Sequence, residues 1–238
     1  MQGSRRPWPR PRAPWVMAQT WTHLMFAHWP VPTAALRARV PRLFDLDLYD
    51  GQAWLGVVPF DLAMIRPRGL PPLPGVSRFP EINVRTYVTV GGRTGVYFFS
   101  LDAANLAAVL TARVFFRLPY RHAAMAIGLG DEGRVRYESR RRRGGAAFRG
   151  TYAGEGPVFT TAPGSLDEFL VERYCLYTSL AGVRLRLEID HPPWSLQRAR
   201  ATIDENSMAV PLGIDLDGEP LLHYVARQEM IGWLPYPC

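Results

Sequence analysis

The sequence contains no lysine: all 28 of its Lys+Arg residues are arginine. A lysine amine can condense with a carbonyl group, whereas a guanidinium cannot, so Schiff-base chemistry on a lysine side chain is excluded. The formal net charge is +7. Arg5, Arg6, Arg10 and Arg12 account for +4 of it within the first 16 residues, where no acidic residue occurs, which leaves +3. That is modest for a domain and argues against a nucleic-acid partner.

Cysteine is also scarce, and the two present, Cys175 and Cys238, do not make a disulfide framework. Cys175 lies in an apolar segment with helical spacing and Cys238 is the last residue, so we expect two free thiols in a reducing cytosol. No apolar run of about 18 residues occurs, and the Arg5-Arg6 pair is followed by prolines and arginines instead of the apolar core of an export signal. These absences predict a cytoplasmic protein without a membrane partner.

Motifs for metal, phosphate and covalent catalysis are missing as well. The five histidines lack metal-binding spacing and no cysteine accompanies them, so we expect structural or surface roles for His23, His28, His122, His191 and His223. No glycine elbow surrounds Ser100, and the glycine-rich segment 91–95 is too short for a phosphate loop. We therefore expect no metal site and no cofactor.

The residues that are present predict one globular domain preceded by an arm. Residues 1–16 are rich in proline and arginine without periodicity, which predicts a disordered arm, and Met17 is an alternative start. From residue 17 to 238 there is no repeat and no linker, and 47% of the chain is apolar. The length and composition fit a single domain with a substantial core.

Apolar periodicity predicts a strand-rich domain with a few helices. The expected helices cover 33–41, with Thr33 as N-cap; 102–116, capped by Asp102; and 165–177, opened by a capping box of Ser165 and Glu168. The expected strands cover 52–60, 79–88, 96–101, 122–129, 134–139, 146–152, 183–190, about 198–203 and part of 221–232. The fold class expected is α+β, β-rich and antiparallel.

The segment FPEINVRTYV, residues 79–88, carries the candidate site. As a strand it places Ile82, Val84, Thr86 and Val88 on one face and Glu81, Asn83, Arg85 and Tyr87 on the other. The alternation leaves two interpretations open, a solvated face or the wall of a cavity. In a cavity, a desolvated carboxyl would have a raised pKa suited to proton transfer, and a fixed guanidinium could hold a carboxylate.

Five short motifs together resemble the DUF2071 (YqjF-like) family: FPEINVRTYV, GVYFFSLDA (95–103), FRLPY (116–120), FLVERYCLYT (169–178) and HPPW (191–194). The resemblance covers about residues 17–235. That family is grouped with the acetoacetate decarboxylase-like fold. The resemblance implies an antiparallel, cone-like β-barrel around a small-molecule cavity, with a few peripheral helices.

On that fold the polar row would point inward. The resemblance makes Glu81 a candidate acid/base, Arg85 and Tyr87 candidate substrate binders, with Tyr87 also a hydrogen-bond donor in catalysis, and Asn83 an orienting amide. The decarboxylase uses a Schiff-base lysine that this chain lacks, so decarboxylation through an imine is excluded. The family likeness leaves the reaction open.

Three functions remain in view. The first is a lysine-independent lyase, hydratase or isomerase acting on an oxo-acid or related polar metabolite, with Glu81, Tyr87, Arg85 and Asn83 in its site. The second is a non-catalytic sensor or carrier that uses the same cavity for a small-molecule ligand. The third is an interaction protein that contacts nucleic acid through residues 1–16 and the arginine-rich segment 140–143. The oligomeric state is left open.

Overall fold

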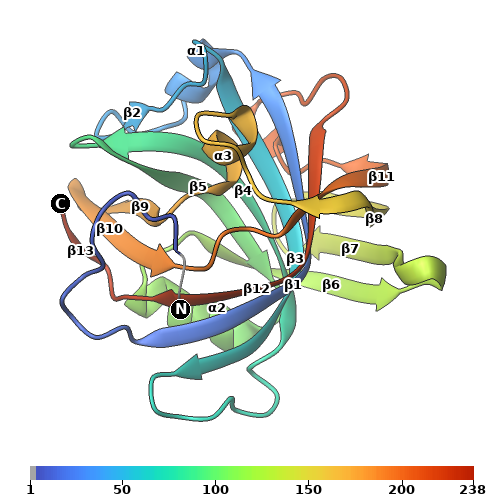
Figure 1. Cartoon of the computed structure of the whole chain (residues 1–238), viewed down its shortest axis with the longest axis horizontal. Coiled ribbons are helices and arrows are strands. Elements are labelled where there is room, and N and C mark those ends of the chain that lie inside the picture. Colours follow the sequence, from blue (N-terminus) through green and yellow to red (C-terminus); the bar gives the residue numbers. More distant parts are fainter. Residues whose placement is uncertain (1–3) are drawn as a thin grey trace.

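A computed structural model describes residues 4–238 and shows a strand-rich molecule built on one large sheet (Figure 1). Five long neighbouring strands form its centre in the order β12-β1-β3-β4-β5. Their bounds are Leu221–Gly232, Met17–Val31, Ala53–Pro67, Phe79–Val90 and Arg93–Ala103. All four pairings between them are antiparallel. We call these five strands the shared wall.

The sheet forks at both edges of the shared wall. At one end, β5 pairs with β9 and β12 pairs with β10, so β9 (Cys175–Leu180) and β10 (Val183–Asp190) close a ring of seven strands. At the other end, β5 pairs with β6 and β12 with β11, and a second ring of nine strands closes. The second set comprises β6 (Tyr120–Leu129), β7 (Val135–Arg141), β8 (Ala147–Phe159) and β11 (Leu196–Asn206). In Figure 1 the two closing sets lie on opposite sides, β9 and β10 on the left and the other four on the right.

Each face of the shared wall packs against its own apolar cluster. In β4, Tyr87 belongs to the cluster of the seven-strand ring, whereas Ile82 and Val84 belong to that of the nine-strand ring. In β1, Phe26 and Met25 divide in the same way. Because alternate side chains of a strand point to opposite faces, a wall with a core on both sides is buried at nearly every position. The wet-face interpretation of residues 79–88 is therefore wrong.

Two pairings of β5 are parallel, where the sequence leads us to expect an antiparallel fold. A parallel neighbour needs a crossover of a dozen or more residues, commonly a helix. The chain between β5 and β6 supplies it with α2, Leu106–Phe115. The other helices are α1 (Thr33–Arg37) and α3 (Leu166–Val171), with 3₁₀ turns η1 (Asp131–Gly133) and η2 (Val210–Leu212) and two-residue strands β2 (Asp45–Leu46) and β13 (Tyr236–Pro237). None of the helices among residues 4–238 is long and apolar enough to cross a bilayer.

Three local predictions need correction. Asp102 does not cap α2: it lies in β5 and binds the Arg141 guanidinium through both oxygens, at 2.8 and 2.9 Å, while Asn105 accepts the capping hydrogen bond from Ala108 N. Helix α1 starts at Thr33 itself, after Pro32, and has no side-chain cap.

The helix predicted over 165–177 is only α3. Ser165 caps it as expected by accepting from Glu168 N, but the chain leaves the helix after Val171 and enters β9. Cys175 is therefore a buried strand residue and Cys238 is half-buried, both as free thiols. Pairing of β9 with β5 and β10 outweighs the local helical spacing of its apolar residues.

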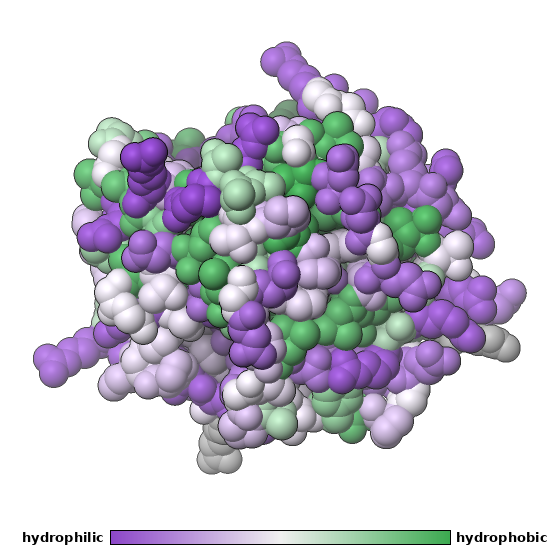
Figure 2. All heavy atoms as spheres, turned by 90° about the horizontal axis from the view of Figure 1, so that it is seen from above, coloured by the Kyte–Doolittle hydropathy of each residue, from purple (hydrophilic) through white to green (hydrophobic). Residues whose placement is uncertain are grey.

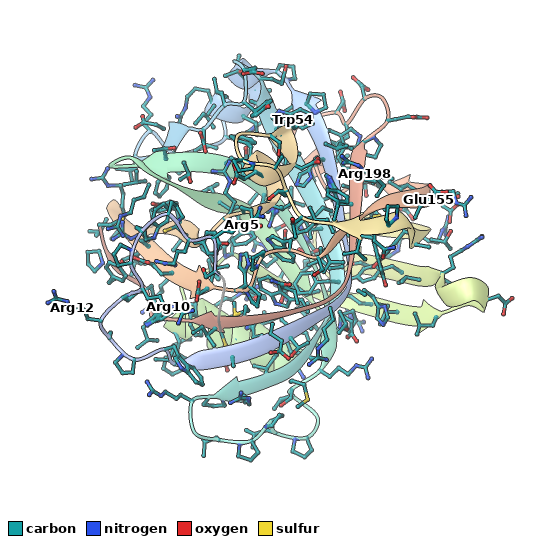
Figure 3. All side chains as sticks on the ribbon, in the orientation of Figure 1. Arg5, Arg10, Arg12, Trp54, Glu155 and Arg198 are labelled. Carbon is teal, nitrogen blue, oxygen red and sulfur yellow. The ribbon has the colours of Figure 1, made fainter. Side chains whose placement is uncertain are left out.

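Residues 4–16 contain no helix or strand, but they make contacts with β10 that their composition does not predict. The Arg6 guanidinium forms an ion pair with Glu188 and donates to the carbonyl of Ile189 at 2.7 Å. Arg10 lies 2.5 Å from Asp190. Figure 3 shows Arg5, Arg10 and Arg12 on this segment, with Arg12 pointing away from the body. Residues 1–3 of the predicted disordered arm lie outside the described part of the chain.

Candidate functional site

The seven-strand ring encloses a cavity of about 370 Å³. Each of its seven strands contributes at least one lining side chain, and further lining side chains come from α2, the loop before β4, the start of β6 and the segment around α3. A volume of this size lies in the range of small-molecule sites, which are largely apolar with a few placed polar groups. Figure 2 shows the outer surface for contrast: hydrophilic side chains surround smaller hydrophobic patches.

The polar row of β4 forms part of this lining. Glu81, Asn83 and Arg85 all contact the cavity, and their exposed fractions are 2%, 5% and 9%. Strand alternation puts the three on one face, and the antiparallel neighbours β3 and β5 hold them at fixed register. Three of the four residues in the polar row thus line the cavity, and the roles given to them stay predictions.

Glu81 is a buried carboxyl group with an unusual proton affinity. Burial raises its pKa from 4.5 to about 8, the Tyr120 hydroxyl lowers it by donating to Oε2 at 3.0 Å, and the nearby Asp102 charge raises it. The Tyr137 hydroxyl fixes the backbone at the same residue by donating to the Glu81 carbonyl at 2.7 Å. A carboxyl group with a pKa near 8 is mostly protonated at neutral pH, yet it can give up and regain its proton there.

Arg85 is a buried cation, and no carboxylate group of residues 4–238 forms an ion pair with it. Its Nη2 donates to the carbonyl of Leu170 at 3.1 Å, and its guanidinium lies 5.0 Å from the centre of the Phe26 ring. The Nε atom has no hydrogen-bond partner within the described residues, and neither has Oδ1 of Asn83. A buried donor and a buried acceptor left unpaired on one face are groups that a bound ligand can satisfy.

Tyr87 differs from the other three residues of its row. It is not among the side chains that line the cavity, and its hydroxyl lies 2.7 Å from His28 Nε2 and 2.9 Å from the Leu170 carbonyl. Burial raises the pKa of Tyr87 and lowers that of His28 well below its usual value, so both groups are neutral. Because Leu170 O also accepts from Arg85, Tyr87 helps to position the arginine.

Two further polar residues of the site come from distant segments, and the sequence reasoning missed both. Tyr120 begins β6, and Arg173 follows α3; both line the cavity. Arg173 is neutralised by Asp47, with Nη1 2.6 Å from Oδ2, and stacks over Phe169 at 4.3 Å. Tyr120 lies in FRLPY and Arg173 in FLVERYCLYT. Because both motifs carry the family resemblance, they were the feature of the sequence that could have identified these two residues.

The described residues contain no group of three or more His, Cys, Asp or Glu side chains arranged as metal ligands. Of the histidines, His28, His191 and His223 are buried, and His223 pairs with Asp167 at 2.9 Å. Ser100 accepts a hydrogen bond from Arg141 Nη2 at 2.9 Å and has no histidine partner. The cavity chemistry that these residues can supply is proton transfer at Glu81 and anion binding at Arg85.

Comparison with known proteins agrees with this architecture. The model of DUF2071, described as an uncharacterized conserved protein, matches residues 18–229. This chain belongs to the DUF2071 family. It is similar to the uncharacterized protein YqjF of Bacillus subtilis (strain 168). The two sequences are 46% identical over 221 residues, which cover 92% of this chain and 91% of YqjF.

Solved structures of the acetoacetate decarboxylase-like fold are similar to this DUF2071 protein in backbone. The enduracididine biosynthesis enzyme MppR, complexed with pyruvate, has a TM-score of 0.66 at 11% identity, over 96% of this chain and 91% of that one. An acetoacetate decarboxylase-like enzyme from Sphingomonas wittichii RW1 has a TM-score of 0.64 at 13% identity, over 95% and 94%. Acetoacetate decarboxylase from Legionella pneumophila scores 0.63 at 12% identity, over 98% and 93%. At these identities the likeness shows the fold, and the fold expected from the motifs is confirmed.

Proposed function

We propose that this DUF2071 protein is an acid–base enzyme of the lyase, hydratase or isomerase type that acts on an oxo-acid without a Schiff-base lysine. The observation that carries the proposal is the location of Glu81, with a pKa of about 8, on the same cavity face as Arg85, a buried cation that forms no ion pair with a carboxylate of the described residues. The pyruvate complex of a structure with this fold supports the substrate class, because pyruvate is an oxo-acid.

Each residue of the row has a role in the proposal. Arg85 binds the substrate carboxylate through its guanidinium group, because the side chain lines the cavity. Glu81 exchanges a proton with the carbon next to the carbonyl group, because its pKa is close to neutral pH. Removal of this proton leaves an enolate and a protonated Glu81, and the NH2 group of Asn83, which also lines the cavity, can donate a hydrogen bond to the negative enolate oxygen. Tyr87 acts through Arg85 as a positioning residue.

Deuterium exchange into 2-oxobutanoate in D₂O, followed by proton NMR, tests the reaction without requiring the natural substrate. We expect the protein to accelerate exchange at the carbon next to the carbonyl group. Glu81→Gln should lower the rate by about 10²-fold or more while binding persists. Arg85→Leu should instead abolish binding. Glu155→Gln serves as the matched control, since Glu155 is an exposed glutamate outside this cavity.

A purely binding function, as a sensor or carrier, gives a different result. It predicts that 2-oxo acids raise the melting temperature of the wild type and of Glu81→Gln alike, and that Arg85→Leu loses this effect. No exchange would exceed the background rate. That combination would contradict the enzymatic proposal.

A further inference from the structure

The cavity is polar along one wall and apolar on the wall opposite. Around the seven-strand ring, β10 and β12 lie farthest from β4. They contribute Leu187, Ile189 and Met230 to the lining, all apolar side chains. A ligand whose carboxylate lies at Arg85 therefore extends toward a surface that offers it no hydrogen bonds.

Three polar side chains elsewhere in the lining already have partners within the protein. Gln19 Oε1 accepts from the indole of Trp21 at 3.0 Å, Ser77 donates to the Leu73 carbonyl, and the Trp194 indole donates to the Val171 carbonyl at 2.8 Å. The buried lining atoms left without partners are Nε of Arg85 and Oδ1 of Asn83. Recognition by polar contacts is thus confined to one end of the ligand, as in sites for amphipathic molecules.

The volume of the cavity also indicates how large a ligand it can hold. If each non-hydrogen atom takes up about 30 Å³, as a water molecule does in the liquid, the cavity of about 370 Å³ holds roughly a dozen such atoms. Pyruvate would fill only about half of that space at the same packing. Apolar walls left without ligand atoms lose dispersion contacts, so a short polar acid uses this site poorly.

We propose that the cavity takes a 2-oxo acid with an unbranched apolar tail of about six carbons, with its carboxylate at Arg85 and its tail against β10 and β12. This assignment rests on the proposed function for the position of the oxo-acid group. It narrows the substrate class from a small polar metabolite to a medium-chain acid.

Isothermal titration calorimetry with pyruvate, 2-oxohexanoate and 2-oxooctanoate tests the tail directly. Each buried methylene should tighten binding by about fourfold, so the dissociation constant should fall roughly 10³-fold from the shortest to the longest probe. A flat or reversed series would overturn the assignment. Leu187→Phe should remove the advantage of 2-oxooctanoate and spare pyruvate, because Leu187 lines the cavity from β10, where the tail is placed. Val183→Phe is the control, since Val183 lies on the same strand, 49% exposed and outside the lining.

The two proposals fail in different ways. Tight, length-dependent binding of all three acids without deuterium exchange would support the ligand class and overturn the catalytic function. Exchange into 2-oxobutanoate together with a flat length series would leave the catalytic function standing and overturn the tail assignment. Absence of both binding and exchange would overturn both.

Discussion

The hydroxyl of Tyr120 donates a hydrogen bond to Oε2 of Glu81, 3.0 Å away. Glu81 lies on β4 of the shared wall, which belongs to both rings, whereas Tyr120 begins β6, which belongs to the nine-strand ring alone. Because a protonated carboxyl group that accepts at Oε2 carries its own proton on Oε1, Tyr120 leaves Oε1 for transfer to a ligand. The pairing of β6 with β5 therefore brings Tyr120 to the carboxyl group that we propose transfers the proton.

Tyr120→Phe should move the titration of Glu81 upward. The lost hydrogen bond favours the charged form, so its removal raises the pKa above about 8. Infrared absorption of protonated carboxylic acid groups, measured against pH, reports the change as protonation that persists to higher pH than in the wild type. Tyr137→Phe is the matched control, because its hydroxyl contacts the Glu81 carbonyl and not the carboxyl group. Equal curves for the wild type and Tyr120→Phe would contradict the role given to Tyr120.

The raised pKa of Glu81 also predicts how stability depends on pH. Between pH 4.5 and about 8 the folded state holds a proton that the unfolded state has lost, so stability falls as pH rises through this window, by about 1.4 kcal/mol per unit from this group. Glu81→Gln removes the group. Its free energy of unfolding relative to the wild type should therefore increase from pH 5 to pH 8 and level off above. Urea denaturation at several pH values measures it, and the exposed Glu155→Gln should show no such trend.

Gly56→Ala should disturb the residues that support Arg85. A Cβ atom at Gly56 would lie 2.9 Å from Cδ2 and 3.0 Å from Nε2 of His28, which is fully buried. We expect a loss of about 1–3 kcal/mol in the free energy of unfolding. Gly128→Ala is a sharp control: Gly128 is also a strand glycine, but its Cβ would meet nothing within 4 Å. A Gly56→Ala protein as stable as Gly128→Ala would contradict the packing described for His28.

The buried ion pair between Arg141 and Asp102 predicts a large difference between neighbouring arginines. Arg141→Met leaves the fully buried Asp102 without its bidentate partner and should cost about 3–5 kcal/mol. Arg140→Met removes an exposed pair with Glu205 and should cost at most about 1 kcal/mol. Chemical denaturation of the two variants under the same conditions makes the comparison, and similar losses would contradict it.

The N-terminal segment should contribute measurably to stability. Arg6→Met removes a cation from Glu188, which is 2% exposed, although Arg93 and Arg186 stay within 3.4 Å of it. We expect a loss of about 2–3 kcal/mol, against at most about 0.5 kcal/mol for Arg12→Met, whose side chain points outward (Figure 3). A chain starting at Met17 should lose more than Arg6→Met, because Asp190 then also lacks Arg10. Thermal unfolding that is unchanged by the truncation would contradict these contacts.

Local patterns predicted most of the elements and one face of the site, because alternation along 79–88 is a property of the strand itself. They did not predict β1 as a strand, and they predicted a helix where β9 begins. Whether that face is wet depends on which strands lie beyond it, and the fork at β5 and β12 arises from pairings between distant segments. For the same reason Asp102 looks like a helix cap from its sequence neighbours, whereas its partner Arg141 lies 39 residues away.

The site residues that the sequence did not reveal also depend on contacts between distant segments. Nothing near Arg173 in the sequence indicates that it faces the strand of Arg85, and its partner Asp47 is 126 residues away. Tyr87 could be placed on the correct face but not given its role, because His28 and the Leu170 carbonyl occupy its hydroxyl. The motif resemblance compensates for this limit, since FRLPY and FLVERYCLYT mark the two segments that meet at the cavity.

The titration of Glu81 itself tests the central claim most directly. With glutamate labelled by ¹³C at the carboxyl carbon, NMR follows each residue against pH, and the signal lost in Glu81→Gln identifies the one of interest. We predict a titration midpoint near pH 8, far from the ordinary 4.5 of a glutamate side chain. A midpoint near 4.5 would mean that the carboxyl group is solvated and charged at neutral pH, and the proton-transfer role of Glu81 would be contradicted.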